Sequence, residues 1–290
     1  MTATLIDGKA VAAEVRAGVR ARVEALRALG VSPGLAAVLV GDDEPSKIYV
    51  GGKQRACAEV GIRSNRLDLP ATISQPDLLR EIRRLNDDPS VHGILVQLPF
   101  PEHISELAVH QMILPEKDVD GLTPISVGRM VRGEWDRTYL PCTPLGIVEL
   151  LVRSGIAIER QDVVIVGRGH LVGLPLAVML AQKMPNANAT VTLVHTGTRD
   201  VASHTRRADI LVVAAGRPGT VSADMVKPGA AVVDVAVNRL PSGKLAGDVD
   251  FGPVSQVAGA ITPVPGGVGP MTIAMLLSNT VTAAERAVAA

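Results

Sequence analysis

The chain has 290 residues, of which 47% are hydrophobic, and this is enough material for the cores of two ordinary domains. Its 29 basic and 29 acidic residues balance, which argues against a broad electrostatic surface for nucleic acid or an anionic membrane, but is compatible with a local phosphate site. The amino-terminal segment carries charges throughout, so we expect neither a signal peptide nor a membrane span, and a cytoplasmic location. Cys57 and Cys142 fit no metal-ligand spacing and are expected to be reduced thiols.

Short apolar runs alternate with helical patterns along the first half of the chain. We expect a helix that begins at an N-cap Ser46 and ends at Gly61. Before and after it, the pattern predicts strands over residues 34–43, 63–70 and 91–101 and an amphipathic helix over 75–89.

The same pattern restarts after a proline-containing connector at residues 137–146. Strands are predicted over 162–169, 189–195, 208–216 and 230–238, with helices over 171–183 and 271–290. Continuous apolar strands separated by helices indicate parallel sheets. The fold class is therefore α/β, with two α/β domains and a closing helix that packs back on the first of them.

The segment "YVGGKQR" places a tyrosine and a lysine four residues apart on the predicted helix. Tyr49 and Lys53 then share a face, although Gly51 and Gly52 between them each cost about 1 kcal/mol relative to alanine. Apolar neighbours can desolvate the Lys53 amine and lower its pKa, which makes it the leading catalytic candidate. The alternative is an ordinary surface lysine beside a core tyrosine.

Gly167, Gly169 and Gly173 form a G-x-G-x-x-x-G pattern between a predicted strand and a helix. Glycines there let the backbone approach a pyrophosphate at the helix N-terminus, which predicts a dinucleotide site. The next strand ends in His195 and Thr196 instead of an acid, and Arg168 lies inside the turn, which favours NADP over NAD. A tight turn without a ligand and a solvent-facing arginine are the alternatives, and we give His195 no catalytic role.

Three further segments contain polar or glycine-rich residues that could bind a ligand. Gln97 ends its strand on the side where open α/β sheets bind ligands, although it could merely cap the strand. Asp118 and Asp120 could bind a cation, hydrogen-bond an amino-substituted heterocycle, or be solvated turn acids; no third metal ligand is evident nearby. The loop "TPVPGGVGPMT" is rigid and poor in side chains, so its backbone can meet a ligand.

Together these segments resemble the bifunctional methylenetetrahydrofolate dehydrogenase/methenyltetrahydrofolate cyclohydrolase family. The resemblance covers nearly the whole chain in order, and its motifs are "YVGGK", "HGILVQLPFP", "PEKDVDGL", "PCTPLGI", "VVIVGRGHLVGLP", "KPGAAVVDVAVN", "GDVDF" and "ITPVPGGVGPMT".

The resemblance implies a role for each matching residue. In the folate-binding part, Lys53 is implied as the catalytic lysine, Tyr49 as the ring against the folate, Gln97 as the partner that tunes Lys53 and Asp120 as the pterin anchor. The folate-side loop is then Pro265, Gly266, Gly267 and Val268. The residues implied to hold NADP are Gly167, Arg168, Gly169, Thr196 and Val237.

The resemblance also implies an organisation and an activity. Residues 1–143, with 265–290 returning to them, form a catalytic folate-binding domain, and residues 144–264 form a Rossmann-like NADP-binding domain. The enzyme oxidises 5,10-methylenetetrahydrofolate with NADP and hydrolyses the product to 10-formyltetrahydrofolate. It serves one-carbon metabolism and purine biosynthesis as a homodimer, without a metal, and its partners are a small folate substrate and no nucleic acid or membrane.

Two departures bear on the cofactor. Many members of the family read G-R-S where this chain reads G-R-G, and many read H-S-x-T where it reads "HTGT". A serine hydroxyl is lost and the hydroxyl of Thr196 is kept, so the margin of NADP over NAD is less secure. Two other readings remain: an NADP dehydrogenase acting on a small carbon acid, and a nucleotide-binding regulatory module. The first leaves the PVPGG loop unexplained, and the second has no need for Tyr49, Lys53 and Gln97 to converge.

Overall fold

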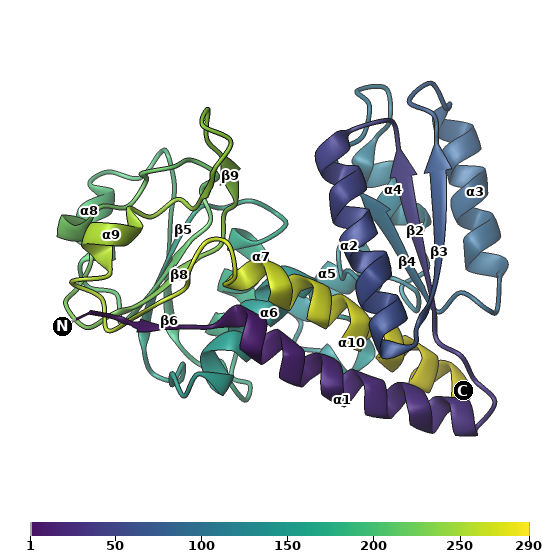
Figure 1. Cartoon of the computed structure of the whole chain (residues 1–290), viewed down its shortest axis with the longest axis horizontal. Coiled ribbons are helices and arrows are strands. Elements are labelled where there is room, and N and C mark those ends of the chain that lie inside the picture. The colour runs from purple at the N-terminus through teal and green to yellow at the C-terminus, as the bar shows by residue number, and fades with distance from the viewer. Residues whose placement is uncertain (1, 290) are drawn as a thin grey trace. The chain divides into compact units, whose positions relative to one another are not determined.

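The computed structural model describes residues 2–289 and divides them into two compact units (Figure 1). The first, which we call the six-stranded unit, contains the described residues up to Ala13 together with Thr143–Thr272. The second, the three-stranded unit, contains Glu14–Cys142 and the described residues from Ile273 onward. Met1 and Ala290, which belong to the predicted first domain and closing helix, lie outside the described residues.

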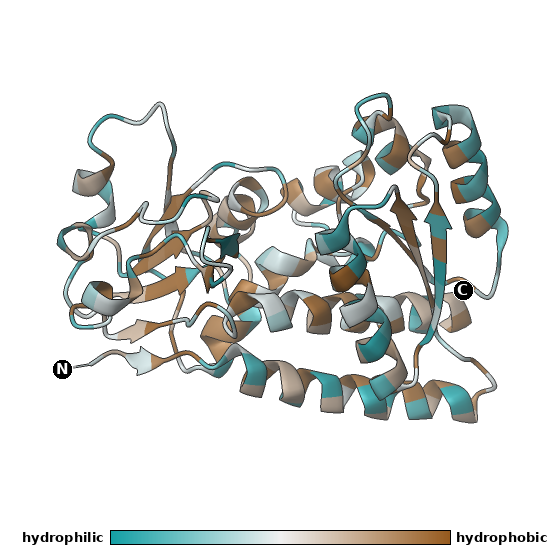
Figure 2. Ribbon diagram, turned by 45° about the horizontal axis from the view of Figure 1, so that its top comes forward, coloured by the Kyte–Doolittle hydropathy of each residue, from teal (hydrophilic) through white to brown (hydrophobic). Residues whose placement is uncertain are grey.

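The three-stranded unit is built on a parallel sheet in the order β3-β2-β4. Its strands are β2 (Gly34–Val40), β3 (Arg63–Leu69) and β4 (Gly93–Gln97), as the apolar runs predict. Every residue of β2 is buried, whereas β3, on an edge, alternates in exposure; Figure 2 shows this contrast in hydropathy. The chain leaves the central strand β2 for one neighbour and returns to the other, so the carboxyl ends of β2 and β4 form a topological switch point.

Helices surround this sheet, and the buried face of each carries its apolar residues. They are α2 (Glu44–Val60), α3 (Gln75–Asp87), α4 (Glu106–Met112) and α5 (Pro124–Val131), followed by a 3₁₀ turn at Trp135–Arg137. Leu78 and Ile82 of α3 pack on Val38 and Ile94 in one core. The prediction of Ser46 as the N-cap of α2 is wrong, because Asp43 caps the helix and accepts a hydrogen bond from the Ser46 backbone N–H. Gly61 ends α2 in the left-handed region with φ 86°, as predicted.

The six-stranded unit has the order β1-β11-β8-β7-β5-β6, with all strands parallel. The predicted strands are β5 (Asp162–Val166), β6 (Thr190–Val194), β7 (Ile210–Val213) and β8 (Ala231–Asp234). Two short strands, β11 (Ala260–Ile261) and β1 (Thr4–Leu5), complete it. Chain order reverses at β5, which lies between β6 and β7, and this is the arrangement of dinucleotide-binding sheets.

The remaining elements of this unit connect the strands. The helices are α6 (Cys142–Arg153), α7 (Gly173–Ala181), α8 (Val201–Thr205) and α9 (Phe251–Val254), with a 3₁₀ turn at Ala223–Met225. A small hairpin pairs β9 (Asn238–Arg239) with β10 (Leu245–Ala246). Helix α6 replaces the second half of the connector predicted over residues 137–146, because Pro144 falls in the first turn of the helix, where a missing N–H costs nothing.

Two long helices, α1 (Gly8–Ala28) and α10 (Val268–Ala289), include residues of both units. In the three-stranded unit, Arg22 of α1 binds Glu285 of α10 at 2.6 Å. The Asn279 amide donates to the carbonyl oxygens of Val119 and Leu140 at 2.8 and 3.1 Å. The closing helix therefore packs back on the unit of β2–β4. This confirms the predicted α/β fold class.

No helix within residues 2–289 combines the length and apolar character that crossing a bilayer requires. Cys57 and Cys142 are both buried free thiols.

Candidate functional site

Lys53 lies on the buried face of α2 with only 6% of its surface exposed. Its Nζ donates a hydrogen bond to Gln97 Oε1 at 3.0 Å and lies 4.9 Å from the centre of the Tyr49 ring. Burial lowers the pKa of the Lys53 amine, and the nearby Asp120 carboxylate opposes this effect. Lys53 is therefore not a surface lysine, and the sequence prediction of a desolvated amine agrees with its environment.

Gln97 is the last residue of β4, and its amide is held in one orientation. Its Nε2 donates to the carbonyl oxygen of Leu98 at 2.8 Å, which leaves Oε1 directed toward Lys53. Ser46 of α2 also approaches the Leu98 carbonyl, at 3.3 Å. The carboxyl end of β4 and the first turns of α2 therefore fix the lysine–glutamine contact from both sides.

The two acids of "DVDG" have different environments. Asp118 is 2% exposed and accepts hydrogen bonds from the backbone N–H groups of Leu122 and Thr123, so its carboxylate shapes the loop. Asp120 is half-buried, and its charge contributes to raising the pKa of Tyr49 after the larger effect of burial. Within residues 2–289 no cluster of three His, Cys, Asp or Glu side chains is placed to hold a metal ion. Lys53, Tyr49, Gln97 and Asp120 are thus brought together in the three-stranded unit.

The glycine turn follows β5 in the six-stranded unit. Gly167 has φ 114°, and a Cβ there would collide with the Ala214 carbonyl oxygen. A Cβ at Gly173 would in turn collide with the carbonyl oxygen of Gly167. Among the described residues other than its chain neighbours, none has an atom within 4 Å of the Cβ position at Gly169, so this part of the turn is open. The turn is a backbone cradle of the kind that admits a pyrophosphate.

Arg168 and His195 face one another at the edge of this turn. Arg168 Nη1 lies 3.3 Å from His195 Nε2, and the Gly197 N–H donates to His195 Nδ1 at 3.1 Å. Because Nδ1 accepts, the ring proton belongs on Nε2, so two donors point at each other. An anion that both groups contact at the exposed edge of the turn would accept from both donors. His195 has no predicted catalytic role, and the fold brings it to Arg168.

The other predicted cofactor and folate positions are also in the six-stranded unit. Thr196 is exposed at the carboxyl end of β6, and Val237 is 56% exposed after β8. In the 265–268 loop, Gly266 has φ 115°, and the Gly267 carbonyl oxygen lies where a Cβ of Gly8 would be. The predicted folate-binding residues therefore belong to two units: Pro265, Gly266, Gly267 and Val268 to this one, and Tyr49, Gln97 and Asp120 to the other.

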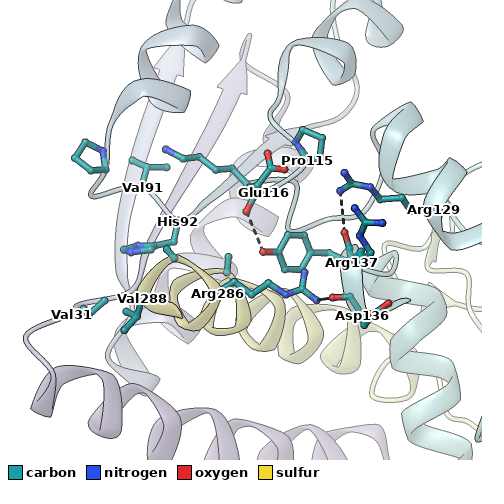
Figure 3. A pocket seen from close by; sticks show the side chains of 15 residues that line it. Val31, Val91, His92, Pro115, Glu116, Arg129, Asp136, Arg137, Arg286 and Val288 are labelled. Atoms are coloured by element: carbon teal, nitrogen blue, oxygen red, sulfur yellow. Dashed lines mark hydrogen bonds between the residues drawn. The ribbon is translucent and has the colours of Figure 1, made fainter. Parts of the chain in front are cut away.

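A separate pocket of about 650 Å³ lies at the amino ends of β2 and β4 (Figure 3). Most of its basic side chains donate hydrogen bonds to backbone carbonyl oxygens. Lys117 Nζ donates to three carbonyl oxygens, and Arg286 stacks on the Tyr139 ring while it donates to the Thr138 and Asp136 carbonyl oxygens. Since the switch point is at the other end of these strands, this pocket is not part of the candidate site.

Comparison with known proteins gives consistent matches along the chain. Residues 6–120 match the family model described as the tetrahydrofolate dehydrogenase/cyclohydrolase catalytic domain, and residues 141–288 match the NAD(P)-binding domain of the same family. The bifunctional protein FolD of Geobacillus kaustophilus is 54% identical over 99% of both chains.

Two solved structures are similar throughout. The bifunctional FolD methylenetetrahydrofolate dehydrogenase/cyclohydrolase of Campylobacter jejuni has a TM-score of 0.94 and 49% identity, and the match covers 98% of this chain and 99% of that one. The Trypanosoma brucei dehydrogenase-cyclohydrolase, solved with NADP and an inhibitor, has a TM-score of 0.93 and 43% identity over the whole of both chains.

Proposed function

We propose that this chain, which belongs to the tetrahydrofolate dehydrogenase/cyclohydrolase family, oxidises 5,10-methylenetetrahydrofolate with NADP and hydrolyses the 5,10-methenyl product to 10-formyltetrahydrofolate. The observation that carries the proposal is the buried Lys53 amine, held between the Gln97 amide oxygen and the Tyr49 ring at the carboxyl end of β4.

Lys53 is the proposed acid and base of the hydrolytic step. Water loses one proton as it adds to the methenyl carbon and a second as the formyl C=O forms, and N5 gains one when its bond to that carbon breaks, so one proton is released overall. A lysine whose pKa is lowered can accept the first of these protons and donate one to N5. A neutral amine can still donate one N–H to Gln97 Oε1 while its lone pair remains available.

The remaining residues are proposed to bind and orient the folate. Tyr49 lies beside Lys53 on α2 and offers a partly exposed ring to the flat pterin. Asp120 anchors the amino-substituted edge of the pterin, since a carboxylate can accept a fork of two N–H donors. Pro265, Gly266, Gly267 and Val268, which belong to the six-stranded unit, are the other residues that we propose to bind folate.

Gly167, Arg168, Gly169, Thr196 and Val237 are the proposed NADP-binding residues. Bound NADP supplies the acceptor for the hydride that leaves the folate methylene carbon. The backbone cradle at Gly167 and Gly169 suits the pyrophosphate. The opposed donors of Arg168 and His195 suit a 2′-phosphate, which favours NADP over NAD.

The functional division that we propose is a folate-binding domain of residues 1–143 and 265–290 and an NADP-binding domain of residues 144–264. It differs from the two compact units at residues 2–13, 143 and 265–272, which pack in the six-stranded unit. The first and last of these segments lie at the folate-side loop, where Gly8 meets Gly267.

A single spectroscopic assay tests the activity. Purified protein is mixed with 5,10-methylenetetrahydrofolate and NADP, and absorbance is followed at the NADPH and methenyl bands. NADPH formation followed by decay of the methenyl signal is the expected result. Absence of NADPH formation with this substrate, while a small hydroxy acid supports it, would assign the chain to another class of dehydrogenase.

The family resemblance further supports a cytoplasmic homodimer that serves purine biosynthesis. Light scattering on the purified protein is expected to give twice the chain mass of 30.2 kDa. A mass of one chain at working concentration contradicts the dimer, and fractionation of cells that express the protein tests its location.

A further inference from the structure

Asp248 is a fully buried carboxylate in the six-stranded unit, between β10 and α9. Its Oδ2 accepts hydrogen bonds from the backbone N–H groups of Ala215 and Gly216, at 2.7 and 2.8 Å. Its Oδ1 accepts from Asn238 Nδ2 at 2.9 Å. The buried Asp248 side chain therefore links the segment after β7 to the segment after β8 through hydrogen bonds.

The segment after β7 is in direct contact with the glycine turn. Ala214 donates its N–H to the Val166 carbonyl oxygen at 2.8 Å, and its own carbonyl oxygen fills the place where Gly167 would carry a Cβ. Ala215 and Gly216 directly follow Ala214, whose carbonyl oxygen packs against Gly167. Holding Ala215 and Gly216 in place therefore also holds Ala214 against Gly167. Asn238, the other residue held by Asp248, directly follows Val237.

Asp248 is itself fixed by a second buried acid, Asp234, at the end of β8. The backbone N–H groups of Asp248 and Val249 donate to the two Asp234 carboxylate oxygens at 2.9 and 3.0 Å. Gly247 must be glycine, because a Cβ there would collide with the Asp234 carboxylate. A continuous network thus leads from the end of β8 through Asp234 and Asp248 to the segments around the glycine turn.

We propose that Asp248 is a positioning residue for NADP: without touching the cofactor, it holds the segment after β7 against the glycine turn and fixes Asn238, which directly follows Val237. This inference rests on the proposed function, because it takes the glycine turn as the NADP site. A structural carboxylate that merely stabilised the unit would affect unfolding but not cofactor affinity selectively. The hydrogen bonds that the Asp248 carboxylate accepts come from Ala215 and Gly216, which follow the backbone packed on the glycine turn, and from Asn238, which follows Val237.

Three substitutions separate the loss of acceptors from the loss of volume. In Asp248→Asn, the amide oxygen can still accept from Ala215 and Gly216, and the Asn238 amide can turn to accept from the new NH₂ group. Asp248→Ser keeps one short acceptor, and Asp248→Ala keeps none and leaves buried N–H groups unpaired. The matched control is Asp209→Ala, which removes a carboxylate at the opposite end of β7 that binds Lys227 and the Asp162 N–H.

The NADP dissociation constant is measured by titration calorimetry, together with the melting temperature and the rate of methenyltetrahydrofolate hydrolysis, which consumes no NADP. We expect the dissociation constant to rise in the order Asn, Ser, Ala, by roughly tenfold to a hundredfold for Ala. Hydrolysis should stay near the wild-type rate in all three variants, and Asp209→Ala should lower the melting temperature without changing the NADP affinity.

Wild-type NADP affinity in Asp248→Ala overturns the inference, as does a loss of affinity in Asp209→Ala equal to that in Asp248→Ala. If the Ala variant does not fold, equal affinities in the Asn and Ser variants overturn it. Failure of the wild-type protein to bind NADP would instead contradict the proposed function, so the two failures are distinguishable.

Discussion

Lys53 combines burial, a fixed amide partner and an aromatic neighbour, and these contacts bear differently on the two reaction steps. Hydride transfer needs geometry more than proton transfer, whereas hydration and ring opening need protons moved. Lys53→Met keeps much of the side-chain length and removes the amine. We therefore expect Lys53→Met to abolish cyclohydrolase turnover, against a typical contribution of ~10²–10⁴-fold from general acid–base catalysis, and to keep NADPH formation at least in part.

The measurement is a time course that follows NADPH and the methenyl chromophore together, and methenyltetrahydrofolate should accumulate. Lys47→Met is the control, because Lys47 is on the same helix but pairs with Asp42 and Glu44 at the surface. Conversion of methenyl to formyl product at the wild-type rate in Lys53→Met would remove Lys53 from the mechanism.

Asp120 is the half-buried acid of the "DVDG" loop, whereas the buried Asp118 carboxylate accepts from the backbone of that loop. Asp120→Ala is expected to weaken folate binding strongly, because the carboxylate is proposed to accept from the pterin. EDTA should leave wild-type activity intact. The Michaelis constant for folate of both proteins, and the activity of the wild type with and without chelator, measure these two effects. Wild-type activity that falls on chelation and returns with a divalent ion would show that Asp120 serves a metal.

Arg168 faces a histidine that also presents a donor, so an anion is the natural partner of both. Arg168→Ala should raise the Michaelis constant for NADP about tenfold to a hundredfold, since a charge-assisted contact contributes ~1.5–3 kcal/mol, and should leave that for NAD nearly unchanged. Arg160→Ala is the control, because that arginine is exposed on the same unit. Equal losses for both cofactors would show that Arg168 does not read the 2′-phosphate.

At the scale of elements, helix α2 contains two glycines that a helix would ordinarily avoid. Beyond the backbone of α2 itself, the nearest described atoms to the Cβ positions of Gly51 and Gly52 are those of the Arg55 side chain, at 3.8 and 4.0 Å. Gly52→Ala should therefore stabilise the protein by up to about 1 kcal/mol. If the glycines give the flat folate close access to the helix, the same change should raise the Michaelis constant for folate.

Gly18→Ala in α1 is the matched control, because Gly18 is exposed and its Cβ position is open. It should stabilise the protein without affecting folate. Unfolding in urea and folate kinetics on both variants make the comparison, and an unchanged folate Michaelis constant in Gly52→Ala would show that the glycine pair has another purpose.

The elements differ in how far sequence predicts them. Strands β4 and β5 are continuous apolar runs between turns; Gln97 ends β4 as predicted, and Gly167 directly follows β5. Helix α1 was not predicted, although Val11, Val15, Val19 and Val23 recur at helical spacing and are buried. The predicted connector at residues 137–146 covers the start of helix α6, because it contains Pro141 and Pro144. The sequence pattern predicts Ser46 as the N-cap of α2, whereas Asp43 caps the helix in the structure. Both residue types are good N-caps and stand three residues apart, so the pattern alone does not separate them.

The contacts that tertiary structure creates had no local signal. His195 and Arg168 are 27 residues apart, and Asp248 is 33 residues from Ala215. A pattern within one segment can show that a residue is unusual, as for Lys53, but not which distant backbone group it will bind. The carboxylate network of Asp234 and Asp248 could therefore not be found before the fold was known.

At the scale of the whole molecule, buried charge makes stability depend on pH. Burial raises the pKa of Asp234 from 3.8 to about 6, and the neighbouring Asp248 carboxylate adds to the effect, while backbone hydrogen bonds oppose it. Folded protein therefore holds this proton more tightly than unfolded protein. The stabilisation is fully present below pH 3.8 and is lost as the pH rises through about 6.

Other groups change stability in the same range with the opposite sign. Burial lowers the pKa of His92, so its contribution is lost as the pH falls. Comparing the wild type with Asp234→Asn cancels this contribution, because His92 is in both proteins. The free energy of unfolding of the wild type, relative to the variant, should fall between about pH 4 and pH 7, by about 1.4 kcal/mol for each tenfold difference in proton affinity.

Urea unfolding at several pH values measures this difference. Asp224→Asn is the control, because contact with Ser222 lowers the pKa of that exposed acid and removes its titration from the range. Asp234→Asn also loses one backbone acceptor, but that loss shifts its curve by an amount that does not depend on pH. A constant difference between wild type and Asp234→Asn across the range would show that Asp234 stays ionised in the folded protein, and that its hydrogen bonds from Asp248 and Val249 outweigh its burial.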